Sequence, residues 1–235
     1  MAGSRIGRRG ILFGAVAAPV SILAVACSDN HAKEVGAIED LMREHGVLRR
    51  AFLIYQEFAV RLRTDDKRVD GNALHETAQL FRTFGEDYHE RTLEEAHIFP
   101  AVRKAGGLAA GYVNVLKDQH ARGRAITDYI LSVTGNGSIS TGNAEPLARA
   151  LETFQIMYAN HAAREDTIVF PAWKSALSEH DLDEMGDKFE DIEKQMFGKD
   201  GFEDAVGRIG RIEKSLGFSD LAQFTAPLPP ATGTP

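Results

Sequence analysis

The sequence is poor in the residues that mark several common classes of protein. It holds a single cysteine in 235 residues, so no disulfide can form within one chain. Acidic residues outnumber basic ones by 34 to 27, and the formal net charge is −7. Because there is no basic stripe to neutralise phosphates, nucleic acid is excluded as a partner. The rest is an ordinary globular composition, 43% hydrophobic and 26% charged, which can bury one substantial core or two small ones.

The apolar run at the N-terminus falls short of what a membrane span requires. It covers residues 11–26 and is interrupted by a glycine and a proline. Arg8 and Arg9 stand directly before it, as in a twin-arginine signal, which exports proteins after they have folded. We therefore expect residues 1–27 to be a signal peptide, and the protein to be exported to the bacterial periplasm or cell envelope.

The single cysteine, Cys27, ends this run in the sequence LAVAC. The segment resembles the lipobox of bacterial lipoproteins, in which this cysteine is acylated, although Ala24 stands where a larger aliphatic residue is usual. The alternative is ordinary cleavage after Ala26, which leaves Cys27 as an incidental N-terminus. Membrane anchoring through a lipidated Cys27 is thus one of two interpretations.

From about residue 36 the pattern predicts five or six helices. Apolar residues recur three and four positions apart, which is typical of a helix packed in a bundle. The first such seam consists of Ile38, Leu41, His45, Leu48, Phe52, Tyr55, Ala59 and Leu62. We expect an all-α bundle over residues 36–178, a helical extension over 181–217, and a disordered proline-rich tail over 218–235.

The bundle sequence repeats itself. His120 follows His45 by 75 residues (120 − 45), Glu165 follows Glu94 by 71 (165 − 94), and two prolines, 100 and 171, are also 71 apart (171 − 100). Pro100 together with Gly106 and Gly107 is expected to end the second helix, and Pro171 to mark the end of the fourth. The chain therefore predicts a four-helix bundle made of two copies of one helical hairpin.

Histidines and glutamates lie on the seams that should face the interior. A buried carboxylate is costly unless a charge or hydrogen bonds replace its water. A pair of divalent transition-metal ions would do so, since each hairpin supplies two histidines and one glutamate. His161 and Glu165 are four residues apart, which places both on one helix face.

Four segments of the chain, MREH, HERTLEEAHIFP, LKDQH and HAAREDTIVFP, resemble the hemerythrin-like, or HHE, family over residues 36–176. The resemblance implies an antiparallel, up-and-down four-helix bundle that holds two non-haem iron ions, bridged by two carboxylates and an oxo or hydroxo group. Carried over to this sequence, the metal ligands are His45, His89, Glu94, His120, His161 and Glu165. Imidazole and carboxylate also accept manganese and zinc, so neither metal is excluded.

The second helix departs from the family pattern, which has a glutamate four residues after the histidine. Here Leu93 is the fourth residue after His89, and Glu94 is the fifth. One inserted residue predicts a π-bulge between His89 and Glu94, a distortion that recurs at functional sites. If the helix instead runs straight, Glu95 points inward and replaces Glu94 as the ligand.

The third helix departs as well, because Arg124 stands where oxygen-carrying hemerythrins have a fifth histidine. Fewer protein ligands leave more open metal positions, which favours reaction over reversible binding. We therefore expect a protein that binds or reacts with O2, NO or H2O2 in oxygen or nitrosative stress or in sensing, as a di-iron oxidoreductase if an electron donor sustains turnover. The alternative is a metal-binding or interaction module at the membrane surface, which would show an exposed apolar stripe on residues 182–216.

Four further histidines have no partner in this scheme. They are expected to be surface or packing residues: His31, His75, His97 and His180.

Overall fold

The structure is a computed structural model that describes residues 35–64 and 69–230. The predicted export segment and Cys27 lie outside the described residues. Within these ranges every regular element is helical and no strand occurs, so the all-α class is confirmed. No helix among the described residues is both long and apolar enough to cross a membrane.

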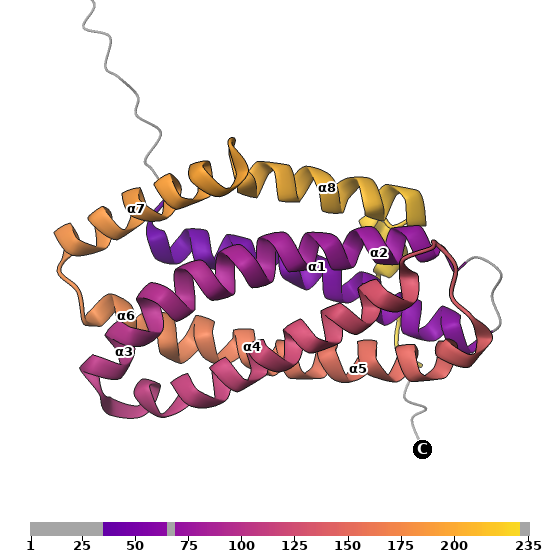
Figure 1. The fold of residues 1–235 in the computed structure, drawn as a ribbon, viewed down its shortest axis with the longest axis horizontal. Coiled ribbons are helices and arrows are strands. Elements are labelled where there is room, and N and C mark those ends of the chain that lie inside the picture. The colour runs from indigo at the N-terminus through magenta and orange to yellow at the C-terminus, as the bar shows by residue number, and fades with distance from the viewer. Residues whose placement is uncertain (1–34, 65–68, 231–235) are drawn as a thin grey trace, which may run out of the picture. The chain divides into compact units, whose positions relative to one another are not determined.

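Four long helical stretches form the bundle, and two of them change from α to π geometry and back along their length (Figure 1). Their elements are α1 (Ala37–Arg63), α2 (Gly71–Leu80), η1 (Phe81–Ile98), α3 (Phe99–Ala105), α4 (Gly107–Thr134), α5 (Thr141–Arg164), η2 (Glu165–Val169) and α6 (Phe170–Ser175). The chain continues with α7 (Glu179–Phe197), α8 (Gly201–Leu216) and the 3-10 helix η3 (Leu221–Phe224). Helix α1 packs mainly on α5, and α4 packs on α2, η1 and α3.

Pro100 and Pro171 do not end their helices as expected. Each lies in the first turn of a short α-helix that directly follows a π segment, and the helices continue to Ala105 and Ser175. Because the residues before each short α-helix, Ile98 and Val169, are themselves helical, both prolines lie inside continuous helices, and each removes one backbone donor there. The glycine that was expected to help end the second helix does so: α3 stops before Gly106, whose φ of 79° lies in the left-handed region.

The core beside the histidines is aromatic. The Phe52 ring lies 4.4 Å from that of Tyr158, 4.8 Å from Phe154 and 5.1 Å from Phe81, measured between centroids. All four rings are buried, and Tyr158 also contacts the rings of His45 and His161. This rigid layer supports the histidines from one side.

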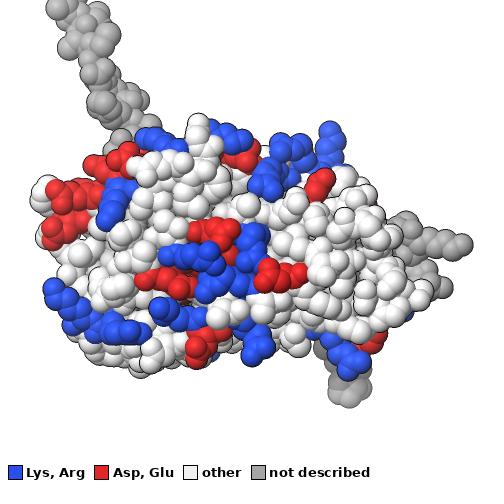
Figure 2. Space-filling model, in the orientation of Figure 1, with Lys and Arg blue, Asp and Glu red and all other residues white. Residues whose placement is uncertain are grey.

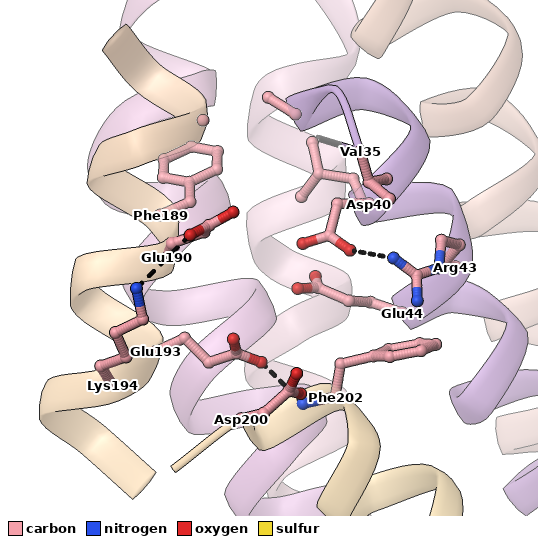
Figure 3. Close-up of a pocket in the computed structure, with 13 residues that line it drawn as sticks. Val35, Asp40, Arg43, Glu44, Phe189, Glu190, Glu193, Lys194, Asp200 and Phe202 are labelled. Carbon is pink, nitrogen blue, oxygen red and sulfur yellow. Dashed lines mark hydrogen bonds and ion pairs between the residues drawn. The ribbon is translucent and has the colours of Figure 1, made fainter. Parts of the chain in front are cut away.

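Helices α7 and α8 lie on the outside of the bundle, where α7 contacts α1 and α8 contacts α1 and α2 (Figure 1). Phe189 on α7 and Ile209 and Ile212 on α8 are buried against the bundle. A cavity of about 210 Å³ remains between α1 and these helices. Figure 3 shows the carboxylates of Asp40, Glu44 and Glu193 directed into this space.

The tail expected to be disordered from residue 218 is described as far as residue 230, and it contains η3. The side chain of Asp220 caps η3 by accepting a hydrogen bond from the backbone N–H of Ala222. The Phe218 ring packs 5.9 Å from Phe224 and lies under the guanidinium of Arg61. Local capping and aromatic contacts thus organise a segment whose composition predicted no structure.

Candidate metal centre

All six predicted site residues meet in the middle of the bundle. Helix α1 supplies His45, η1 supplies His89 and Glu94, α4 supplies His120, α5 supplies His161 in its last turn, and η2 begins with Glu165. Every one of these side chains is at most 4% exposed. Their donor atoms form two overlapping groups, one around His45 and His89 and one around His120 and His161.

The two carboxylates face both pairs of histidines. Glu94 places Oε1 3.4 Å from His89 Nε2 and Oε2 3.3 Å from His120 Nε2. Glu165 places Oε1 3.0 Å from His161 Nε2 and Oε2 3.6 Å from His45 Nε2. Each glutamate therefore offers one oxygen to each pair, as a ligand that bridges two ions would.

The chemistry of these atoms fits a pair of cations. Both oxygens of Glu94, both of Glu165 and Nε2 of His89 are buried and have no hydrogen-bond partner among the described residues. Such groups cost free energy unless a positive charge satisfies them. Two divalent ions among four imidazoles and two carboxylates would satisfy them together.

The Nδ1 atom of each histidine, on the side of the ring away from the two carboxylates, contacts a further polar side chain. His89 Nδ1 lies 2.5 Å from Glu44 Oε2, and His45 Nδ1 lies 2.7 Å from Asp166 Oδ1. A neutral imidazole that donates a hydrogen bond from Nδ1 keeps its lone pair on Nε2, which here points at the carboxylates. Arg49 in turn pairs with Asp166.

The second pair of histidines has the same arrangement with one chemical difference. His120 Nδ1 lies 3.0 Å from Glu95 Oε1, whereas His161 Nδ1 lies 2.9 Å from the amide oxygen of Gln119. Three of the four outer partners are therefore carboxylates and one is a neutral amide. A carboxylate raises the basicity of the imidazole more than an amide does, so His161 is the weakest donor of the four.

Sequence analysis did not identify three of these outer partners, Glu44, Asp166 and Gln119, and it considered Glu95 only as an alternative ligand. Each one is the chain neighbour of a site residue, in the dipeptides EH, ED, QH and EE. Each nevertheless contacts a histidine of another helix, which sequence spacing alone does not reveal. The one feature of the sequence that could have pointed to these partners is that a polar residue stands directly beside a predicted ligand in each of the four dipeptides.

The π geometry predicted between His89 and Glu94 is confirmed, and it extends further than expected, over all of η1. Backbone hydrogen bonds in a π-helix join residues five apart, so residues five apart share a face. His89 and Glu94 accordingly point into the same space, while Glu95 turns toward the outer edge of His120. A second π segment, η2, begins at Glu165 and was not predicted.

Burial and charge act in opposite directions on this cluster. Burial lowers the pKa of His89 and of His120, but neighbouring glutamates outweigh it and hold both pKa values well above the usual range. Burial raises the pKa of Glu94, yet the two histidines hold it well below its usual value. Without metal, the cluster thus favours an ionised Glu94 beside protonated His89 and His120, and a bound cation would replace the protons on these two histidines.

Arg124, in the place of the family's fifth histidine, pairs with two acids other than the bridging candidates Glu94 and Glu165. Its Nη2 lies 3.0 Å from Glu95 Oε1, and its Nη1 lies 3.4 Å from Oε2 of the buried Glu90. Burial raises the pKa of Glu90, an acid that the sequence pattern did not single out. The single positive charge of Arg124 is therefore shared between two acids beside the second histidine pair.

The histidines outside the scheme lie elsewhere. His75 is hydrogen-bonded to Thr134, the His97 ring packs 5.9 Å from Phe189, and His180 is exposed beside Glu184. His31 lies outside the described residues.

Comparisons with known proteins identify a family of cation-binding domains. Residues 36–173 match the model of the hemerythrin HHE cation binding domain. Uncharacterized proteins of Mycobacterium tuberculosis (strain ATCC 25618 / H37Rv) and Mycobacterium bovis (strain ATCC BAA-935 / AF2122/97) are each 45% identical over 192 residues, or 81% of this chain and 74% of theirs. No solved structure matches the chain significantly.

Proposed function

Because the chain belongs to the hemerythrin HHE cation-binding family, we propose that its central cluster binds two iron ions. His45 and His89 hold one ion, His120 and His161 hold the other, and Glu94 and Glu165 bridge them. The observation that carries this proposal is that each carboxylate offers one oxygen to each histidine pair. On this basis Glu94, and not Glu95, is the bridging ligand.

The proposed bundle is the antiparallel, up-and-down arrangement of two repeated hairpins. Each hairpin contributes both histidines of one ion, since α1 is paired with η1 in one histidine pair and α4 with α5 in the other. The repeated spacing of histidine, glutamate and proline supports this internal symmetry.

We further propose that the ions bind or react with O2, NO or H2O2. Four imidazole nitrogens and four carboxylate oxygens give four protein donors per ion (8 divided by 2), which leaves positions open for a small ligand. When bound, an iron pair of this kind supplies electrons to such a ligand. The chain's residues orient the ions and exclude bulk water through burial, and Arg124, which pairs with Glu90 and Glu95, supplies no metal ligand in place of a fifth histidine.

We also infer a role for the Tyr158 hydroxyl in this site. It is buried without a hydrogen-bond partner in the described part of the chain, and its ring contacts both His45 and His161. Burial raises the pKa of Tyr158 well above its usual value, and the charge of Glu165 raises it further. The hydroxyl therefore stays protonated and can donate a hydrogen bond to a ligand in the site.

The same proposal includes location. Export by the twin-arginine route would allow the metal to be inserted before the folded protein crosses the membrane, and acylation of Cys27 would anchor it in the cell envelope. The sequence of residues 1–27 supports this part of the proposal.

The alternative, an interaction module that uses its C-terminal helices, lacks the expected surface. The apolar residues Leu182, Met185 and Ile192 of α7 pack against the core, and Phe189 is buried. Met196 alone among the large apolar residues of α7 and α8 is exposed by more than a third, at 43%. No apolar stripe therefore remains on these helices for a partner.

The test is metal content and the visible spectrum of the purified protein, measured beside two histidine variants. We expect about two irons per chain, and loss of at least one in His120→Ala. His75→Ala is the matched control, because His75 is hydrogen-bonded to Thr134 and has no contact with the cluster. This substitution should leave the iron content unchanged. A well-folded protein without bound iron, or equal iron loss in both variants, would refute the proposal.

A further inference from the structure

A groove of about 350 Å³ opens between α3 and the first half of α4. Three exposed cations line it, Arg103 and Lys104 from α3 and Lys117 from α4. Its one acidic residue, Glu95, pairs with Arg124 at 3.0 Å and lies 3.0 Å from the ring of His120. The groove is therefore positive, on a chain whose formal net charge is −7.

The floor of this groove touches a histidine of the metal centre. The Phe99 ring stacks on the His120 ring at 5.5 Å and 18°, and Oε1 of Glu95 lies 3.0 Å from His120 Nδ1. Phe99 and Glu95 both line the groove. His120 is thus separated from the groove by one layer of side chains, and Glu95 links it to the surface through a hydrogen bond.

The other cavity that approaches the centre has the opposite charge. Glu44, the outer partner of His89, lines the cavity beneath α7 together with Asp40 and Glu193 (Figure 3). An acidic partner would be repelled there and attracted at the basic groove. Figure 2 shows basic side chains gathered at the end of the bundle where α3 meets α4, while the middle of the same face carries mixed charges.

We propose that the basic groove between α3 and α4 docks an acidic protein that carries single electrons and delivers them to the metal pair at His120. The inference rests on the proposed function. In each encounter the donor's reduced centre loses one electron and the metal pair gains it, and no atom is transferred. Two encounters supply the two electrons that an iron pair can hold. Electron-transfer complexes are small and depend on charge, which suits a shallow groove with three cations.

The test uses an acidic [2Fe–2S] ferredoxin as the probe, because recognition by charge does not depend on one particular partner. The protein carries the double substitution Lys104→Glu and Lys117→Glu, which reverses the charge of the groove. Its matched control, Arg211→Glu with Lys214→Glu, makes the same change of net charge on exposed positions of α8, far from α3 (Figure 1). Reduction of the iron-loaded protein by reduced ferredoxin is followed by stopped-flow absorbance at low salt.

We expect the second-order rate constant to fall about tenfold or more in the groove variant and less than about twofold in the control. The difference should vanish at about 0.5 M salt, where the Debye length is only a few Å. Equal loss in the two variants would assign the effect to net charge and overturn the proposal. An unchanged rate in both, or failure of the unaltered protein to accept electrons from the ferredoxin, would overturn it too.

A second readout separates this inference from the proposed function. The dissociation constant for oxidised ferredoxin is measured at low salt by calorimetry, which involves no electron transfer. We expect weak binding that is lost in the groove variant and kept in the control. If the protein binds ferredoxin but contains no iron, the proposed function is refuted and the docking surface is kept. If the protein contains iron but its binding does not depend on the groove, the docking surface is refuted and the proposed function is kept.

Discussion

Each of the four histidines is held by a residue from another helix, and these contacts close a ring. Glu44 of α1 contacts His89 of η1, and Glu95 of η1 contacts His120 of α4. The ring continues with two more contacts, from Gln119 of α4 to His161 of α5 and from Asp166 of η2 to His45 of α1. Every helix of the bundle thus both supplies a histidine and orients the histidine of a neighbour, so the centre and the packing depend on each other.

This ring predicts a graded effect of substitutions at Glu44. Glu44→Ala removes the acceptor that orients His89 and should weaken metal affinity about 10- to 100-fold. Glu44→Gln keeps an acceptor oxygen at the same place and should weaken affinity much less. Competition with a chelator, followed by metal analysis, measures both. Equal losses in the two variants would mean that the charge of Glu44, and not its hydrogen bond, is what matters.

At the scale of the helical elements, the π segment η1 accommodates one extra residue between His89 and Glu94 while both side chains still face the centre. Removal of Arg91, an exposed residue between His89 and Glu94, would give this helix the four-residue spacing found between His161 and Glu165. The π turn could then relax to α geometry while both site residues keep their direction. We predict that this deletion retains both metal ions, measured by metal analysis together with circular dichroism.

Deletion of one residue from a regular α-helix should behave differently. Asp118 is exposed in α4, two positions before His120. Each residue of an α-helix advances the chain by about 100° around the helix axis. Removal of Asp118 therefore rotates His120 by about 100° relative to the preceding part of the helix. We expect loss of metal in this control. Loss of metal in both deletions would show that η1 is not an insertion that can relax.

At the scale of the whole described molecule, α7 and α8 cover one side of the bundle. The cavity between them and α1 is lined by several acidic side chains. Burial raises the pKa of Glu193 to about 7, and Asp200, Glu44 and Asp40 add to it by repulsion. For the same main reason the pKa of Asp40 rises to about 6. A carboxyl whose pKa is raised by folding binds its proton more tightly in the folded state, so stability is lost as pH rises through the interval between the two pKa values.

For Glu193 this interval runs from its ordinary value of 4.5 to about 7. Glu193→Gln removes the charge but keeps an oxygen that can accept the hydrogen bond from the backbone N–H of Phe202. We expect the variant to be more stable by about 1 kcal/mol at pH 8 and unchanged near pH 4.5, after allowance for the half-exposed position. Urea unfolding at both pH values tests this.

Glu184→Gln provides the control for this measurement, because Glu184 is exposed on the outer side of α7. It should change stability little at either pH. Stabilisation by Glu193→Gln that does not depend on pH would contradict the electrostatic explanation.

The order and spacing of residues along the chain were enough to identify which side chains could form the centre. The three-four spacing placed His45, His120 and His161 on buried seams, and the count from His89 to Glu94 predicted the π distortion. These features are local, because the period of a helix fixes which side chains share a face. The family, the all-α class and a cation site followed from the same local patterns.

The contacts between helices became visible only once the helices were packed together. It turned Glu94 inward and Glu95 toward His120, brought Glu44, Asp166 and Gln119 to histidines of other helices, and opened a basic groove above Phe99. It also extended η1 over 18 residues, added η2 and organised the tail around Phe218. The physical reason is that a contact between two helices depends on their relative rotation and distance, which side-chain packing sets and the spacing along one helix does not contain.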